Sequence, residues 1–151
     1  MDGIIFDVDG TLWDSVEVVA ESWNLAIKEN SDLDPNLNRE ILQGLFGKTM
    51  DEIAAGVFPD LDTDSRRKLM DICFDYENRY LETHPGVYYE GVMDTLKELA
   101  LEYPLFIVSN CQCGYIEVMM KGAGMEPYIK DLFWPDADFQ RPDDSEINGE
   151  K

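Results

Sequence analysis

The 151-residue sequence is poor in basic residues and has no long apolar run. Lys and Arg total 12 against 32 Asp and Glu, so the formal net charge is −20. A surface of that charge repels nucleic-acid phosphates and anionic membranes, and we expect neither as a partner. No apolar stretch approaches the roughly 20 residues that cross a bilayer, which predicts no membrane span. An anionic ligand would need a local cation.

Cysteine and histidine are also scarce. Three cysteines cannot form a fully paired disulfide framework, and the N-terminus lacks the basic and apolar regions of a secretory signal peptide. A reduced, cytoplasmic protein is therefore expected. The hydrophobic fraction of 44% is still enough for a packed core, so the high charge does not imply disorder.

Two short apolar runs end in polar residues, as buried strands of a parallel sheet do. Residues 3–6 run into Asp-Val-Asp-Gly-Thr at 7–11. Residues 105–108 follow a helical pattern over 92–102 and end at Ser-Asn, residues 109–110. We therefore predict two strands that both stop at polar loops.

Between these strands the apolar spacing predicts helices and no convincing strand. Ser15 is expected to cap the first of them. The predicted helices run from there through Ile27 and over 37–45, 50–57, 65–81 and 115–121, with a short turn or helix at 127–133. Four aromatic residues are assigned to the core of the inserted helical cap: Trp13, Trp23, Phe74 and Tyr76.

This order of elements divides the chain into a split core and an insertion. Residues 1–14 and 86–134 are expected to form the core, and residues 15–85 an inserted helical cap. Residues 135–151 are acidic and show little periodicity, so we expect a disordered tail there.

Two aspartates stand where the first strand is predicted to end. In an extended segment Asp7 and Asp9 point to the same side, and Gly10 allows a sharp turn after them. One carboxylate can act as a nucleophile while its neighbour exchanges protons, and together they attract a divalent cation. The pair alone also fits an Asx-type turn. A calcium loop does not fit, because Val18 stands where its last Glu is needed.

The complete phrase is more specific than the pair. Residues 4–12 read Ile-Ile-Phe-Asp-Val-Asp-Gly-Thr-Leu, and residues 106–110 read Phe-Ile-Val-Ser-Asn. They resemble the first and second motifs of the haloacid dehalogenase (HAD) superfamily, in its phosphatase and phosphomutase branch. The helical insertion resembles a cap of the phosphoglycolate phosphatase and beta-phosphoglucomutase type. This resemblance, over about residues 1–133, implies an α/β fold: a Rossmann-like HAD core with an incomplete parallel sheet and an inserted α-helical cap domain.

The resemblance also implies a role for each matching residue. Asp7 would be the nucleophile that forms an aspartyl-phosphate, and a magnesium ligand through its carboxylate. Asp9 would be the general acid and base and would bind Mg²⁺ through its backbone carbonyl. Ser109 and Asn110 would hold the phosphoryl oxygens, and Thr11, counted with them, would steady the loop. The implied substrate is a small phosphorylated metabolite.

Four further residues invite an assignment. Lys48 lies in a segment that resembles the cap loop facing the active site, so it is a candidate contact for an anionic substrate. We favour the other interpretation, an ordinary lysine near a helix start. His84 lies in what resembles the hinge from cap to core, which favours a linker role. Cys111 and Cys113 lack a second Cys/His cluster to complete a tetrahedral metal site.

The sequence departs from the family pattern after the second motif. The lysine that neutralises the aspartyl-phosphate has no confident match, and Arg141 lacks the expected loop before a helix. An acidic pair should follow an apolar strand, but Asp143 and Asp144 follow none. We therefore expect a truncated chain, or one whose end is out of frame, and a first strand with an unpaired edge. A homo-oligomer is one way to cover that edge.

Three functions remain open on these residues. The first is a magnesium-dependent phosphatase that works through an aspartyl-phosphate and is impaired by the missing motifs. The second is a non-catalytic phosphate-binding module. The third is a phosphomutase, which shares the same motifs.

Overall fold

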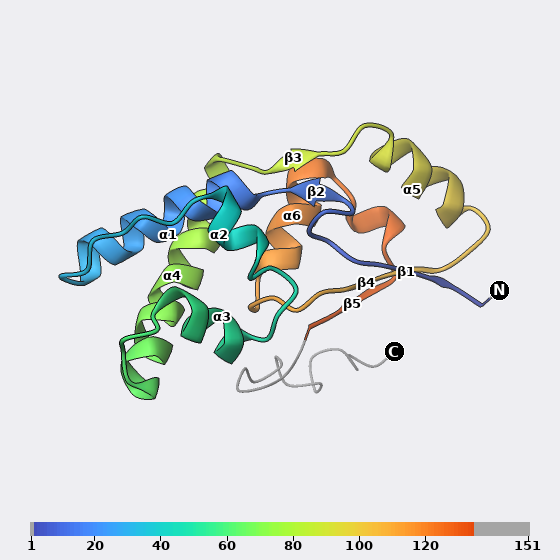
Figure 1. Cartoon of the computed structure of the whole chain (residues 1–151). Helices are drawn as coiled ribbons and strands as arrows, with labels where there is room; N and C mark the ends of the chain where they lie inside the picture. Colours follow the sequence, from blue (N-terminus) through green and yellow to red (C-terminus); the bar gives the residue numbers. More distant parts are fainter. Residues whose placement is uncertain (1, 135–151) are drawn as a thin grey trace, which may run out of the picture.

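The computed structural model describes residues 2–134 and has a three-stranded parallel sheet at one end and a group of helices at the other (Figure 1). The strands are β1 (Ile4–Phe6), β4 (Leu105–Val108) and β5 (Asp131–Phe133), in the order β1-β4-β5. Ile5 pairs with Phe106, and Ile107 pairs with Leu132. The two predicted strands are confirmed, and they are parallel neighbours. Both therefore end at the same edge of the sheet.

Strand β5 was not predicted. The sequence predicts one short turn or helix at 127–133, whereas the structure has a 3₁₀ turn (Glu126–Tyr128) followed by a strand. Three residues are too few for a visible alternation, and pairing with β4 fixes the strand. The Lys130 N–H donates to the Leu105 carbonyl at 2.8 Å, and the Ser109 N–H donates to the Phe133 carbonyl at 3.1 Å.

The inserted segment is helical, as predicted. Its helices are α1 (Val16–Asn30), α2 (Arg39–Gln43), α3 (Met50–Val57) and α4 (Thr63–Thr83). The second is shorter than predicted, because the Asn38 side chain accepts a hydrogen bond from the Ile41 N–H and starts the helix there. Helix α3 starts at a capping box between Thr49 and Glu52. The domain boundaries at residues 15 and 85 stay predictions.

Two clusters of buried apolar side chains hold the molecule together. The first lies among α1 to α4 and includes Trp23 and Phe74, with Tyr76 packed against it, as predicted. The second surrounds the sheet and contains Trp13. The assignment of Trp13 to the cap core is therefore wrong. Trp13 belongs to β2 (Trp13–Asp14), which pairs with β3 (Val87–Tyr88) and sets its ring against Tyr88 and Tyr115.

Helices α5 (Val92–Ala100) and α6 (Tyr115–Ala123) lie in the second part of the chain, close to their predicted positions. Helix α6 contributes buried Ile116 and Met119 to the second cluster and also packs against α4. This contact brings the start of α6 to the junction of the two clusters.

Strand β1 pairs only with β4 among the described residues, and the side chain of Ile5 is 68% exposed. The expectation that β1 has an unpaired edge thus holds within residues 2–134. In that same range no helix is long and apolar enough to span a membrane. The predicted tail and Arg141, Asp143 and Asp144 lie outside the described residues.

Candidate active site

The loop after β1 folds back on itself around one carbonyl group. The amides of Thr11 and Leu12 donate to the Val8 carbonyl at 3.1 and 2.9 Å. Gly10 has a φ of 76°, a left-handed conformation that glycine adopts without strain. Because Val8 is buried, its neighbours Asp7 and Asp9 project on the other side of the chain.

Both aspartates and the end of β4 line one cleft of about 260 Å³. Its other lining residues are Phe46, Gly47, Val108, Ser109 and Asn110. The strand ends are adjacent because β1 and β4 are parallel neighbours. The structure thus brings together four of the predicted site residues, Asp7, Asp9, Ser109 and Asn110.

The cap forms one wall of this cleft. The Asn110 side-chain amide donates to the Gly47 carbonyl at 2.8 Å, which links the loop after β4 to the loop before α3. Asn110 is therefore already bound to the cap in this conformation. A phosphoryl group would reach it only beside or in place of that contact.

Asp9 is held by a hydrogen-bond network. Its Oδ1 accepts from the Tyr115 hydroxyl at 2.5 Å and from the Ser15 hydroxyl at 3.3 Å. The Trp13 indole N–H in turn donates to the Tyr115 oxygen at 3.2 Å. Burial raises the pKa of Asp9 to about 6, and these hydrogen bonds act in the opposite direction. Asp9 can therefore carry or release a proton close to neutral pH, as a general acid and base must.

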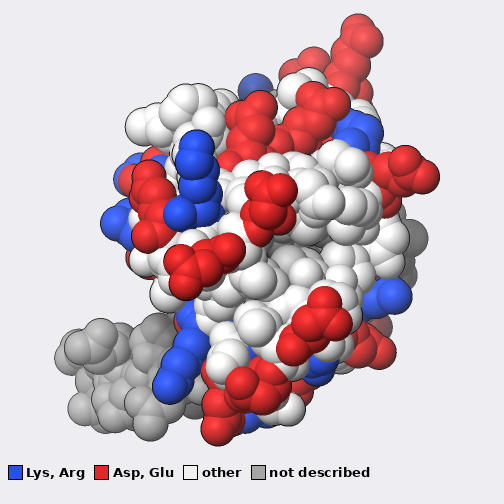
Figure 2. All heavy atoms as spheres, turned by 60° about the vertical axis from the view of Figure 1, so that its left-hand side comes forward, with Lys and Arg blue, Asp and Glu red and all other residues white. Residues whose placement is uncertain are grey.

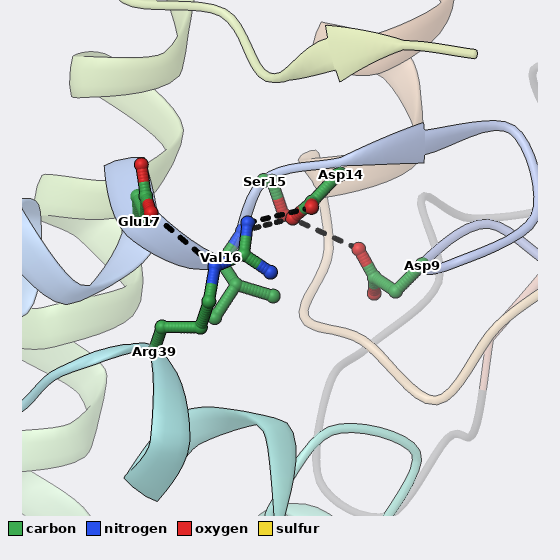
Figure 3. Close-up of polar contacts among 6 residues, drawn as sticks. All are labelled: Asp9, Asp14, Ser15, Val16, Glu17 and Arg39. Atoms are coloured by element: carbon green, nitrogen blue, oxygen red, sulfur yellow. Dashed lines mark hydrogen bonds and ion pairs between the residues drawn. The ribbon is translucent and has the colours of Figure 1, made fainter.

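Ser15 has a different role from the predicted one. It stands at the start of α1, but its side chain makes no cap hydrogen bond and points to Asp9 (Figure 3). The Val16 N–H instead donates to Asp14 at 3.2 Å. Arg39 of α2 binds Asp14 at 2.6 Å, and this ion pair lowers the pKa of the Asp14 carboxyl. The start of α1 is thus fixed to both α2 and the aspartate loop.

Two predicted site residues do not line the cleft. Thr11 is exposed and takes part in the loop through its backbone N–H. Lys48 is exposed next to Gly47, and neither Thr11 nor Lys48 is among the residues that line the cleft. His84 is exposed at the end of α4 and stacks on Tyr80.

The donor set suits magnesium. Mg²⁺ prefers oxygen ligands and is commonly bound by one or two carboxylates, with phosphate and water completing the octahedron. Asp7 and Asp9 provide two carboxylates on one cleft. Within residues 2–134 there is no group of three or more His, Cys, Asp or Glu side chains that could hold a metal. Besides the described side chains, backbone carbonyls, substrate and water can supply further oxygen ligands.

Glu77 and Gln112 were missed by the sequence analysis. Glu77 of α4 is 3% exposed and accepts hydrogen bonds from the Trp23 indole N–H at 2.5 Å and the Gln112 side-chain amide at 3.0 Å. Burial raises the pKa of Glu77 to about 8, against those two hydrogen bonds. A glutamate on a helix gives no sign of burial unless its helical spacing is compared with the apolar face: Glu77 follows Phe74 by three residues.

Tyr115 was missed as well. In the sequence it is an ordinary aromatic residue at the start of a predicted helix. Only the fold brings its hydroxyl into hydrogen-bond contact with Asp9, 106 positions earlier in the chain. The nearby Cys111 is buried, and burial raises the pKa of its thiol well above its usual range. The thiol is therefore protonated at neutral pH.

A sequence model of the haloacid dehalogenase-like hydrolases matches residues 4–149. This match covers almost the whole chain, both aspartates and the end of β4 included. The chain belongs to the haloacid dehalogenase-like hydrolase family. None of the curated proteins matches it significantly.

Solved structures share the fold. A predicted phosphoglycolate phosphatase from Haemophilus somnus is 20% identical with a TM-score of 0.78, over 97% of this chain and 68% of the other. A haloacid dehalogenase-like family protein from Streptococcus pneumoniae is 20% identical with a TM-score of 0.71, over 91% of this chain. YfnB from Bacillus subtilis, described as a HAD-hydrolase and solved bound to magnesium, is 25% identical with a TM-score of 0.59, over 97% and 71% of the two chains.

The chain covers 63% of the length of the Streptococcus pneumoniae protein. The first two structures are too distant in sequence to establish more than a fold. That fold is the α/β core with a helical cap that the sequence motifs imply.

Proposed function

We propose that this protein is a magnesium-dependent phosphatase of small phosphorylated metabolites that works through an aspartyl-phosphate. The observation that carries the proposal is the shared cleft of about 260 Å³, which Asp7 and Asp9 line together with Ser109 and Asn110. Such a cleft admits a phosphoryl group between a nucleophile, a proton donor and hydrogen-bond donors.

The reaction needs two proton transfers. In the first step a carboxylate oxygen of Asp7 attacks phosphorus, the ester P–O bond breaks, and Asp9 donates its proton to the leaving alkoxide. In the second step Asp9 takes a proton from water, the water oxygen attacks phosphorus, and the bond to Asp7 breaks to release inorganic phosphate. The raised pKa of Asp9, about 6, supports this use of one group as acid and then base.

Magnesium would supply charge neutralisation on the phosphoryl oxygens. Asp7 would hold it through its carboxylate and Asp9 through its backbone carbonyl. Support comes from the Asp7 carboxylate on the cleft and from the magnesium-bound relative YfnB. The Ser109 hydroxyl and the amide that follows it would hold the other phosphoryl oxygens.

Turnover is expected to be slow. Among residues 2–134, no Lys, Arg or His lines the cleft, so part of the charge on the phosphoryl group stays uncompensated. Loss of one preorganised charge-stabilising group typically costs about 10²–10³ in rate. The 151-residue chain is therefore expected to be an impaired phosphatase.

Metal removal tests this proposal directly. With an aryl phosphate as substrate, we expect slow phosphate release that stops when EDTA is added and returns when Mg²⁺ is restored. The measurement is the rate of inorganic phosphate release at saturating substrate. A rate unchanged by EDTA would contradict magnesium dependence, and a kcat in the ordinary enzyme range of about 1–10³ s⁻¹ would contradict impairment.

The binding module and the phosphomutase remain alternatives. If no turnover is detected, calorimetry with Mg²⁺ and inorganic phosphate tests the binding module. No detectable binding would contradict it. A phosphomutase would transfer the phosphoryl group between positions of one substrate and release little inorganic phosphate.

Substituting Tyr115 by Phe removes one of the two hydroxyl donors to Asp9. We expect hydrolysis of alkyl phosphates to fall about tenfold to a hundredfold, the value of one hydrogen bond to a charged group. An activated aryl phosphate is expected to lose much less, because its phenolate leaves without a proton. The measurement is kcat/KM for both esters.

Tyr88→Phe is the matched control for this prediction. The Tyr88 hydroxyl donates to the Met119 carbonyl at 2.6 Å, in the same apolar cluster but away from Asp9. It is expected to affect both esters equally. Equal losses on both esters in Tyr115→Phe would mean that Tyr115 only supports the fold.

A further inference from the structure

A second pocket lies between the cap and the core, directly beside the phosphate cleft. It shares Asp9, Phe46, Gly47 and Asn110 with that cleft. Its volume is about 30 Å³, room for about one or two water-sized groups. A phosphate ester whose phosphorus faces Asp7 would extend its alcohol part past Asp9 towards this pocket. The lining of the pocket would then contact the leaving group.

The ionisable groups that line this pocket are all acids, which are neutral or negatively charged. Asp9 and Glu77 line the pocket together with the Tyr115 phenol and the Cys111 thiol, and within residues 2–134 no Lys, Arg or His does. Lys48 follows Gly47 but is exposed and lines neither cavity. Whether Glu77 is ionised or protonated, it supplies no positive charge.

The charge of the whole chain is also unfavourable to an anion. The net charge is −20, and on the face shown in Figure 2 acidic side chains are scattered together with basic ones. A carboxylate on the leaving group would lose its water shell in the pocket and find no counter-ion among the described residues that line it. Burying an unpaired charge is strongly unfavourable, and doing so beside other carboxyls is more so.

The pocket does offer partners to a hydrogen-bond donor. Glu77 and Gln112 meet at one side of it, joined by the hydrogen bond of 3.0 Å between them. Asn78 accepts a second hydrogen bond from the same Gln112 amide, and it donates to the Cys113 carbonyl at 2.9 Å. These contacts hold the Glu77 and Gln112 side chains in place between α4 and the loop after β4. The other walls are apolar, formed by Trp23, Phe46, Met50, Ile53 and Phe74.

We propose that this site accepts phosphate monoesters whose alcohol part is small and carries no negative charge. A hydroxyl or ammonium group on that alcohol donates to the Glu77 carboxyl and the Gln112 amide oxygen. Esters with a carboxylate on the alcohol, such as 2-phosphoglycolate, are rejected. This inference rests on the proposed phosphatase function and adds the substrate class to it.

Three two-carbon esters test the proposal, because they differ only in the group at the far carbon. They are 2-phosphoglycolate with a carboxylate, 2-hydroxyethyl phosphate with a hydroxyl, and phosphoethanolamine with an ammonium group. The affinity of the wild-type chain for each, and for inorganic phosphate, is measured by calorimetry with Mg²⁺, alongside phosphate release. We expect 2-phosphoglycolate to bind at least about tenfold more weakly than the other two.

The outcomes separate this proposal from the function on which it rests. Equal affinity for the three esters, or tightest binding of 2-phosphoglycolate, would overturn the charge selection and leave the phosphatase in place. If neither the esters nor inorganic phosphate bind and no ester is hydrolysed, the proposed function fails and the inference fails with it.

A pair of variants assigns the selection to Glu77. The wild type is expected to bind phosphoethanolamine more tightly than 2-hydroxyethyl phosphate, because an ammonium group beside Glu77 favours the ionised carboxylate. Glu77→Gln is expected to reduce this preference to about one, because the amide cannot ionise. Glu82→Gln makes the same change at an exposed position of α4 and is expected to keep the wild-type preference. An unchanged preference in a folded Glu77→Gln chain would overturn the role of Glu77. If that variant does not fold, the wild-type comparison of the three esters still decides the charge selection.

Discussion

Substituting Asp7 by Asn is expected to reduce magnesium-dependent phosphate release by about 10³-fold or more, to the background rate. An amide does not ionise and is a poor nucleophile, so no acyl phosphate forms. Asp7 is exposed at the end of β1, and its Oδ1 accepts only the N–H of Val8 among the described residues. The substitution is therefore expected to leave the fold intact. The measurement is phosphate release from an aryl phosphate, with mass spectrometry of the acid-quenched protein.

Asp2→Asn is the matched control, because Asp2 is an exposed aspartate just before the same strand. It makes the same change in charge and is expected to keep full activity. A phosphorylated chain should be detected for the wild type and Asp2→Asn, and be absent for Asp7→Asn. Retention of more than about a tenth of the activity in Asp7→Asn would mean that Asp7 is not the nucleophile.

Substituting Glu77 by Gln is expected to change how stability depends on pH. The pKa of Glu77 is 4.5 in a model peptide and is raised by burial to about 8 in the folded chain. Between these values the folded protein holds a proton that the unfolded chain has released. The stability from this group is present below about pH 4.5 and is lost as pH rises towards about 8. The full loss is on the order of 5 kcal/mol.

The measurement is the free energy of unfolding in denaturant at about pH 5 and about pH 8.5. Wild type should lose several kcal/mol more than Glu77→Gln over this range, because glutamine does not titrate. The raised pKa of Asp9 acts in the same direction, but it is common to both chains and cancels in the difference. Glu82→Gln, exposed on the same helix, should follow the wild type. Parallel pH curves for wild type and Glu77→Gln would contradict a buried proton on Glu77.

Local signals were sufficient for most of the secondary structure. The helix over 50–57 begins at a capping box that can be read from Thr49 and Glu52, and it was predicted with its observed bounds. Strands β1 and β4 were visible as apolar runs that stop at polar residues. Strand β5 was not, since its three residues are held by hydrogen bonds to β4 and carry no pattern of their own.

The candidate site was predictable at the polar residues that directly follow strands β1 and β4. Asp7, Asp9, Ser109 and Asn110 were predicted together from the resemblance to the two HAD motifs. All four line the cleft, because β1 and β4 are parallel neighbours that end at one edge of the sheet. Thr11 is as near in sequence but does not line it, because the loop turns at Gly10 and exposes its side chain.

The sequence by itself determined that this chain has an α/β core with a helical insertion and two aspartates at the end of its first strand, because periodicity and motifs are local properties. Only the tertiary structure decided what surrounds those aspartates. Tyr115 reaches Asp9 from 106 positions away, and Glu77 meets Gln112 from 35 positions away. Contacts of this kind depend on how α4 and α6 pack, and no local pattern encodes them. They turn an acidic motif into a site whose acid is buried and whose leaving-group pocket carries no positive charge among the described residues.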